Sequence, residues 1–272
     1  MAVIVLCSAS GSPGVTSTAL GLALAWPRPV LLVDADPTGG SAIFAGYLRA
    51  QSAPTDSLVD LALAARDGHL TAAIAAAVIR IPGPSGEDVS TVSLLPGTRA
   101  HGQARGLSGL WEPLAAELAA LEDTGQDVIV DAGRLGLVGS PQPLLYAADV
   151  ALLVARSDLV SLAGARSWAE TLRTGFERVG GVSALSLLLV GEGRPYSAGE
   201  VRKVLQIPVT ASLPWDPDAA AVFARGATAP RRFGSSALVR SLTAASTAVQ
   251  AAAAANREQL AAVGAGSAGG LA

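Results

Sequence analysis

Residues 3–24 read VIVLCSASGSPGVTSTALGLAL, and this stretch decides the fold. The apolar run from Val3 to Cys7 is typical of a buried strand, and the pattern from Thr16 to Ala25 is typical of a helix. Between them lies a short loop that contains Gly11 and Gly14. A glycine-bearing loop that leads directly into a helix presents free backbone N–H groups and the positive end of the helix dipole. The stretch therefore predicts a binding site for phosphate.

The loop has the spacing of the phosphate-binding pattern G-x-x-x-x-G-K-[ST], with two replacements. Ala9 takes the first glycine position and Val15 takes the lysine position, whereas Thr16 keeps the hydroxyl. For the loop taken alone, an ordinary strand-to-helix turn capped by serine or threonine stays open as an alternative.

Apolar runs and helical patterns alternate along most of the chain. The predicted strands are Val3–Cys7, Val30–Val33, Val89–Leu95, Asp127–Val130, Val150–Ala155, Ala184–Val190 and Val209–Leu213. The predicted helices are Thr16–Ala25, Ser57–Arg66, His69–Val78, Leu107–Leu121, Leu159–Arg178, Ser197–Leu205 and Asp218–Arg225. Strands that are apolar throughout are typical of a parallel sheet covered on both faces. We predict a three-layer α/β/α, doubly wound domain with seven or eight mostly parallel strands.

The C-terminal part of the chain changes composition. Residues 234–258 include a run of alanines and predict a packed final helix. Residues 259–272 are rich in glycine, alanine and serine, which predicts a disordered tail. We therefore expect a single domain over residues 1–258.

Composition and charge exclude several classes of protein. The chain has 272 residues, 50% of them hydrophobic, and a net charge of −3. So apolar a chain is not disordered as a whole, and its acidic balance makes nucleic acid an unexpected partner. It lacks a charged secretory start and an apolar run of about 18 residues, so we expect a cytoplasmic protein without membrane insertion. Of its 19 basic residues, only Lys203 is a lysine.

Three aspartates follow two of the predicted strands. Asp34 and Asp36 follow the strand that begins at Val30, and Asp131 follows the strand that begins at Asp127. The carboxyl ends of strands form the ligand crevice of an open α/β sheet, so these side chains should converge near the glycine-bearing loop. A role for each aspartate as a simple cap of the following segment stays open.

Together, these motifs resemble those of the ParA/MinD group of P-loop ATPases over about residues 2–245. The resembling segments are a deviant Walker A motif (K-G-G-x-G-K-T-[TS]) at residues 10–17, a D-x-D-P switch I segment at 34–37, a Walker B and switch II segment at 131–133, the segment after Walker B at 148–154, and a loop similar to I-P-x-D at 212–216. The resemblance implies a P-loop NTPase fold.

The resemblance also implies a nucleotide site with Mg²⁺. The residues that match its nucleotide contacts are Gly11, Ser12, Pro13, Gly14, Val15, Thr16, Ser17 and Pro214. Thr16, Asp34 and Asp131 match the residues at the metal. Asp36 matches the residue that orients the attacking water in an active member. A homodimer and a protein partner are further implications.

The chain departs from the family at both of its lysines. The family's phosphate-contacting lysine is Val15 here, and the signature lysine that reaches across a nucleotide-sandwich dimer is Ser10. An asparagine that contacts adenine is also missing, since residues 190–193 read VGEG. A hydrogen bond to a charged group contributes about 1.5–3 kcal/mol, so losing two costs roughly 3–6 kcal/mol, or about 10²–10⁴ in affinity.

We therefore predict a pseudo-ATPase that binds ATP and Mg²⁺ weakly and acts as a spatial organiser or adaptor for a partner complex. One alternative is an active, ATP-dependent monomer–dimer switch. Another is a partition protein that binds DNA nonspecifically. The basic residues it would use are Arg225, Arg231, Arg232 and Arg240. An arginine from elsewhere in the fold is a further candidate for the missing positive charge.

Overall fold

The computed structural model describes residues 2–50, 57–84, 91–121 and 125–268, with side chains described as far as residue 262. Eight strands of this part of the chain form one sheet in the order β3-β4-β2-β5-β1-β6-β7-β8. The strands are β1 (Val3–Ser8), β2 (Val30–Asp34), β3 (Ile79–Arg80), β4 (Val92–Leu95), β5 (Asp127–Arg134), β6 (Val150–Arg156), β7 (Leu185–Val190) and β8 (Val209–Leu213). Every pairing is parallel except that of β3 with β4. The predicted doubly wound α/β class is confirmed.

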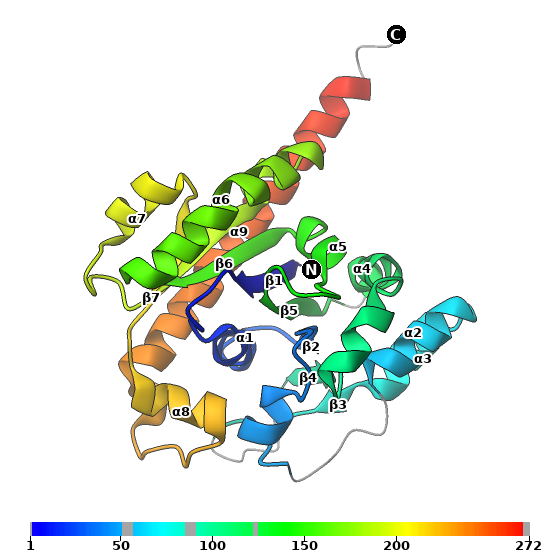
Figure 1. Ribbon diagram of the computed structural model, residues 1–272, viewed down its shortest axis with the longest axis horizontal. Helices are drawn as coiled ribbons and strands as arrows, with labels where there is room; N and C mark the ends of the chain where they lie inside the picture. The colour runs from blue at the N-terminus through cyan, green and yellow to red at the C-terminus, as the bar shows by residue number, and fades with distance from the viewer. Residues whose placement is uncertain (1, 51–56, 85–90, 122–124, 269–272) are drawn as a thin grey trace.

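Helices cover both faces of the sheet (Figure 1). One layer contains α2 (Leu58–Arg66), α3 (Leu70–Ala77), α4 (Trp111–Ala120), α5 (Gln142–Tyr146), α6 (Leu159–Arg178) and α7 (Ala198–Leu205). The other contains α1 (Val15–Leu24), α8 (Pro217–Arg225) and α9 (Ala237–Ala268). Each layer packs its apolar side chains on one face of the strands, and this explains why β1, β2 and β7 are buried along their whole length.

The order of the strands brings the loops that follow β1, β2 and β5 to one edge of the sheet. β1 lies between β5 and β6, and β5 lies between β1 and β2. Asp34, the last residue of β2, pairs in register with Asp131 of β5. The carboxyl ends of β1, β2 and β5 therefore meet where the chain enters α1, which is the crevice expected in an open α/β sheet.

Several local features differ from the sequence-based expectations. The third predicted strand was expected from Val89, but β4 begins at Val92, and residues 89 and 90 lie outside the described part. The short antiparallel β3, the π-helix Ile43–Tyr47 and α5 were not predicted. These elements are too short to show a hydrophobic period.

The last helix is longer than predicted. α9 runs from Ala237 to Ala268, so the helix continues ten residues beyond the end predicted at residue 258, and residues 269–272 lie outside the described part. Asn256 and Arg257 of α9 bond to Asp149 beside β6, which fixes the helix near that point. Beyond it, α9 projects from the body of the molecule (Figure 1). Within the described residues, we find no helix with the length and apolar character needed to span a bilayer.

Candidate functional site

The glycine-bearing loop adopts a conformation suited to binding an anion. Gly11, Ser12 and Gly14 have φ values of +76°, +43° and +92°, in the left-handed region, and Gly14 is the N-cap of α1. Apart from Pro13, which has no N–H, the backbone N–H groups from Ser10 to Ser17 donate no hydrogen bond among the described residues. A run of free amides at the start of a ten-residue helix is a natural cradle for phosphate.

Both positions at which the resemblance implies a lysine are occupied by packed side chains. Val15 is 7% exposed and belongs to the apolar layer under α1, together with Ile4 and Leu6. The Ser10 hydroxyl packs on Gly164 of α6, where a Cβ would overlap it, and it is buried without a hydrogen-bond partner in the described structure. Neither side chain brings positive charge to the loop.

The three aspartates converge beside the loop, as their positions after parallel strands predict. Asp34 and Asp131 are buried. The absence of a side chain at two glycines leaves room for the carboxylates, because a Cβ on Gly97 would lie 2.8 Å from Asp34 Cγ and a Cβ on Gly133 would overlap the Asp36 carboxylate. The Gly133 N–H also donates to Asp131 Oδ1 at 3.0 Å.

The ionisation of the aspartates is strongly perturbed. Burial is the main cause that raises the pKa of Asp131 to about 7, and the nearby Asp34 carboxylate raises it further. A hydrogen bond with the Thr16 side chain lowers this pKa, while Asp36 adds a smaller rise. Burial is also the main cause that raises the pKa of Asp34 to about 6, against a hydrogen bond with Ser41 that lowers it. The surroundings of Asp34 and Asp131 therefore disfavour the negative charge of both carboxylates.

The same carboxylates fit a hydrated Mg²⁺ ion. The Oδ2 atoms of Asp34 and Asp131 are buried and have no hydrogen-bond partner within the described residues. Thr16, at the first turn of α1, adds a hydroxyl that interacts with Asp131. In the described part of the chain, no group of three or more acidic, histidine or cysteine side chains is placed to hold a metal ion by itself. Magnesium keeps several waters and takes phosphate oxygens as ligands, so an incomplete protein set is what a Mg-nucleotide requires.

Two arginines that the sequence did not single out contact the loop backbone. Arg134, at the end of β5, donates from Nε to the Ala9 carbonyl at 3.3 Å. Arg156, at the end of β6, donates from Nη2 to the Ser12 carbonyl at 3.2 Å. Both residues end strands whose carboxyl edge forms the crevice, and that position is the signal that could have identified them.

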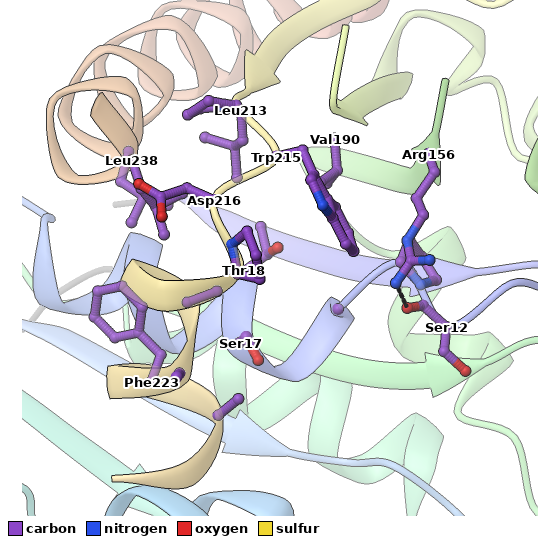
Figure 2. A pocket seen from close by; sticks show the side chains of 18 of the residues that line it. Ser12, Ser17, Thr18, Arg156, Val190, Leu213, Trp215, Asp216, Phe223 and Leu238 are labelled. Carbon is purple, nitrogen blue, oxygen red and sulfur yellow. Dashed lines mark hydrogen bonds between the residues drawn. The ribbon is translucent and has the colours of Figure 1, made fainter. Parts of the chain in front are cut away.

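A cavity of about 400 Å³ opens beside the loop (Figure 2). Ser12, Pro13, Gly14 and Ser17 line one side of it, and Pro214 also lies in its wall. The remaining lining side chains are mainly apolar and come from β7, β8, α8 and α9. They include Val190, Leu213, Trp215, Ala220, Ala221, Phe223, Leu238 and Leu242. A cavity of this volume lies within the usual range for small-molecule sites.

The cavity does not contain all of the predicted site residues. Gly11, Val15 and Thr16 do not line it, and neither do the three aspartates. The structure therefore divides the predicted site into two parts that share only the loop and the start of α1.

The four arginines named as candidates for binding nucleic acid are all exposed, and two of them have contacts elsewhere in the fold. Arg225 lines the cavity, and Arg240 donates to the Ser235 carbonyl. Arg231 and Arg232 are exposed in the turn that precedes α9. Cys7 is fully buried, and burial raises the pKa of its thiol to about 12, so it is not a nucleophile.

Solved structures of similar fold cover nearly the whole chain. A ParA family ATPase from Chlorobium tepidum TLS is 21% identical with a TM-score of 0.67, covering 90% of this chain and 97% of that chain. The septum site-determining protein MinD complexed with Mg-ADP from Pyrococcus horikoshii OT3 is 18% identical with a TM-score of 0.64, covering 90% and 94%. The MinC:MinD cell division protein complex from Aquifex aeolicus is 17% identical with a TM-score of 0.67, covering 92% and 96%.

No protein-family model matches the chain, and no curated protein matches it by sequence. At identities of 17–21%, the structural similarity establishes the fold.

Proposed function

We propose that this chain is a cytoplasmic, ParA/MinD-like organising protein that binds Mg-nucleotide weakly, does not hydrolyse ATP efficiently, and positions or recruits a partner protein complex. The observation that carries the proposal is the burial of Val15 in the apolar layer under α1, at the position where the resemblance implies the catalytic lysine. The packing of the buried Ser10 Oγ against Gly164 of α6 supports it independently.

The charge balance around the loop argues against efficient phosphoryl transfer. Asp34, Asp36 and Asp131 gather on one side of the loop, and a nucleoside triphosphate would add further negative charge. Phosphoryl transfer depends on positioning and on electrostatic stabilisation of the transferred group. A site that has lost two lysines lacks roughly 3–6 kcal/mol of that stabilisation.

The remaining groups still support binding. The free amides of the loop would hold phosphate oxygens, while Thr16, Asp34 and Asp131 would hold the metal. Mg²⁺, when bound, supplies neutralising charge between the phosphates and the carboxylates. Asp36 would orient water only in an active enzyme, and its carboxylate already accepts a hydrogen bond from the Thr38 N–H at 2.8 Å.

A role in recruiting a partner draws on the named relatives. One similar structure is a MinD complexed with Mg-ADP, and another is a MinC:MinD complex. We extend to this chain only the general property of binding a second protein, since the partner would be recognised by surface residues that the fold does not fix.

The proposal is tested by measuring phosphate release from Mg-ATP by the purified full-length protein. The Asp36→Ala variant is the matched control, because it removes the residue expected to orient water. We expect the wild type to release phosphate no faster than this variant. Substantial Mg-dependent turnover by the wild type that Asp36→Ala abolishes would contradict the proposal.

An active ATP-dependent monomer–dimer switch is the second candidate function. The cavity of about 400 Å³ beside the loop is compatible with it, because an active switch needs a pocket for the nucleotide. This candidate requires the mass measured by light scattering to double when Mg-ATP is added. A mass that does not change when Mg-ATP is added counts against this candidate. If that unchanged mass is the mass of a dimer, the two copies associate without nucleotide, through their helix faces.

A further inference from the structure

The Arg156 side chain lines the cavity and contacts the glycine-bearing loop. It is the last residue of β6, at the carboxyl edge of the sheet. Its guanidinium lies over the Trp215 ring, 4.3 Å from the centroid, while Nη2 donates to the Ser12 carbonyl at 3.2 Å. Figure 2 shows the arginine and the tryptophan on the wall of the cavity, with the bond to Ser12 drawn as a dashed line.

The backbone around Arg156 is fixed, but its side chain keeps unused donor capacity. The Arg156 N–H donates to the Ser161 hydroxyl at 2.9 Å, which anchors the strand end to the first turn of α6. The side-chain Nε is shielded from solvent and has no hydrogen-bond partner in the described structure. A buried guanidinium donor without a partner is energetically costly, and a bound anion would satisfy it.

The other charged side chains of the cavity are less suited to holding an anion. Asp216 carries negative charge, and its Oδ1 caps α8 by accepting the Ala219 N–H at 3.0 Å. Arg225 lies at the last residue of α8, and no contact with the loop is found for it within the described residues. Among the charged residues that line the cavity, Arg156 is the one bonded to the loop.

We propose that Arg156 supplies, from the end of β6, the positive charge that the loop itself lacks, and that it binds the phosphate chain of a nucleotide held in the cavity. Trp215 is the platform that holds the guanidinium in place. The inference deepens the proposed function and rests on its claim that nucleotide binding is weakened rather than lost.

The Arg156 guanidinium would form stronger hydrogen bonds with a phosphate than it now forms with the loop. The guanidinium now donates to a neutral carbonyl, and it would exchange this bond for charge-assisted bonds to phosphate oxygens, which are about twice as strong. A planar guanidinium can also form two parallel bonds to one phosphate while it stays stacked on an aromatic ring. Arg156 would thus replace part of the lost lysine charge, from a different element of the fold.

The test is a calorimetric titration of the full-length protein with Mg-ATP, inorganic tripolyphosphate and adenosine. The variants are Arg156→Ala and Arg156→Lys, and Arg194→Ala is the control. Arg194 is exposed close to Arg156 and Trp215, and its removal changes the net charge by the same amount. We expect Arg156→Ala to weaken the binding of Mg-ATP and of tripolyphosphate by about 10- to 100-fold, with adenosine binding unchanged.

The Arg156→Lys variant separates the effect of the positive charge from the effect of the planar guanidinium group. Arg156→Lys keeps the charge but loses the planar fork, so it should recover part of the affinity for tripolyphosphate. Arg194→Ala should bind all three ligands like the wild type. The melting temperature of each variant without ligand shows whether a loss of affinity reflects a loss of folded structure.

Three outcomes would overturn the inference. Equal tripolyphosphate affinities for Arg156→Ala and Arg194→Ala would remove any role in phosphate binding. Tighter binding by Arg156→Ala would mean that the arginine blocks the site. A wild type that binds neither Mg-ATP nor tripolyphosphate would overturn the inference together with the proposed nucleotide site. Rapid ATP turnover combined with weakened binding by Arg156→Ala would instead refute only the proposed lack of hydrolysis.

Discussion

The two sides of the glycine-bearing loop differ in their chemistry. On one side lies the acidic flank, which consists of Asp34, Asp36 and Asp131 at the ends of β2 and β5. On the other side lies the aromatic flank, which consists of Arg156, Pro214 and Trp215 at the ends of β6 and β8. The acidic flank keeps the carboxylates that suit a metal, whereas the aromatic flank keeps a cavity that suits a nucleoside.

The loop between the flanks has a backbone conformation suited to an anion but carries no lysine or arginine side chain of its own. Gly11 and Gly14 retain left-handed φ values, whereas Val15 packs into the core. The difference shows that a loop can have the backbone shape of an anion site without a positively charged side chain, because backbone amides set the shape and side chains supply most of the charge. The following predictions test whether each flank behaves as its chemistry implies.

The largest effect is expected from the buried carboxylates of the acidic flank. The folded-state pKa of Asp131 is raised to about 7 and that of Asp34 to about 6, so the folded state retains protons that the unfolded chain loses near pH 4. Without metal or nucleotide, the free energy of unfolding should therefore fall as the pH rises from about 4 through about 7. We expect a fall of a few kcal/mol in urea unfolding with EDTA present.

The Asp131→Asn variant should flatten this pH profile and unfold at higher urea than the wild type at pH 8. Asp67→Asn is the control, since Asp67 is exposed at the end of α2. If Asp131→Asn and the wild type lose stability in parallel between pH 4 and pH 8, then Asp131 does not carry the raised pKa.

A smaller effect is expected from the glycine that accommodates Asp36. Gly133→Ala places a methyl group at φ +62° and against the Asp36 carboxylate, so it should destabilise the protein by about 1–3 kcal/mol. Gly193→Ala, in the loop after β7, has φ +79° but open space around its Cβ, and it measures backbone strain alone. In urea unfolding at neutral pH, equal losses for the two variants would mean that Asp36 does not pack on Gly133.

The sequence predicted the sheet well, because its strands are apolar on both faces and stand out from their surroundings. Asp34 and Asp131 meet as predicted, since residues that end neighbouring parallel strands must share an edge. The register of β2 and β5 then brings Asp34 beside Asp131, and Asp131 also interacts with the Thr16 side chain.

Other features depend on contacts that no local pattern reveals. The contact of Arg156 with Ser12 joins residues 144 positions apart, and the stacking on Trp215 adds a third segment. The packing of Ser10 on Gly164 depends likewise on how α6 crosses the loop. The end of α9 was misjudged because alanine favours helix strongly enough to carry it through the scattered glycines near the end of the chain.

The most direct test of the loss of lysine charge is a calorimetric titration of Mg-ATP into the wild type, Val15→Lys and Val15→Met. Methionine is long and unbranched but uncharged, so the comparison with lysine isolates the charge from the change in packing. We expect Val15→Lys to bind Mg-ATP about 10- to 100-fold more tightly than Val15→Met, with the wild type close to Val15→Met. Equal affinities for Val15→Lys and Val15→Met would contradict the claim that the loop keeps the shape of a phosphate site and lacks only its positive charge.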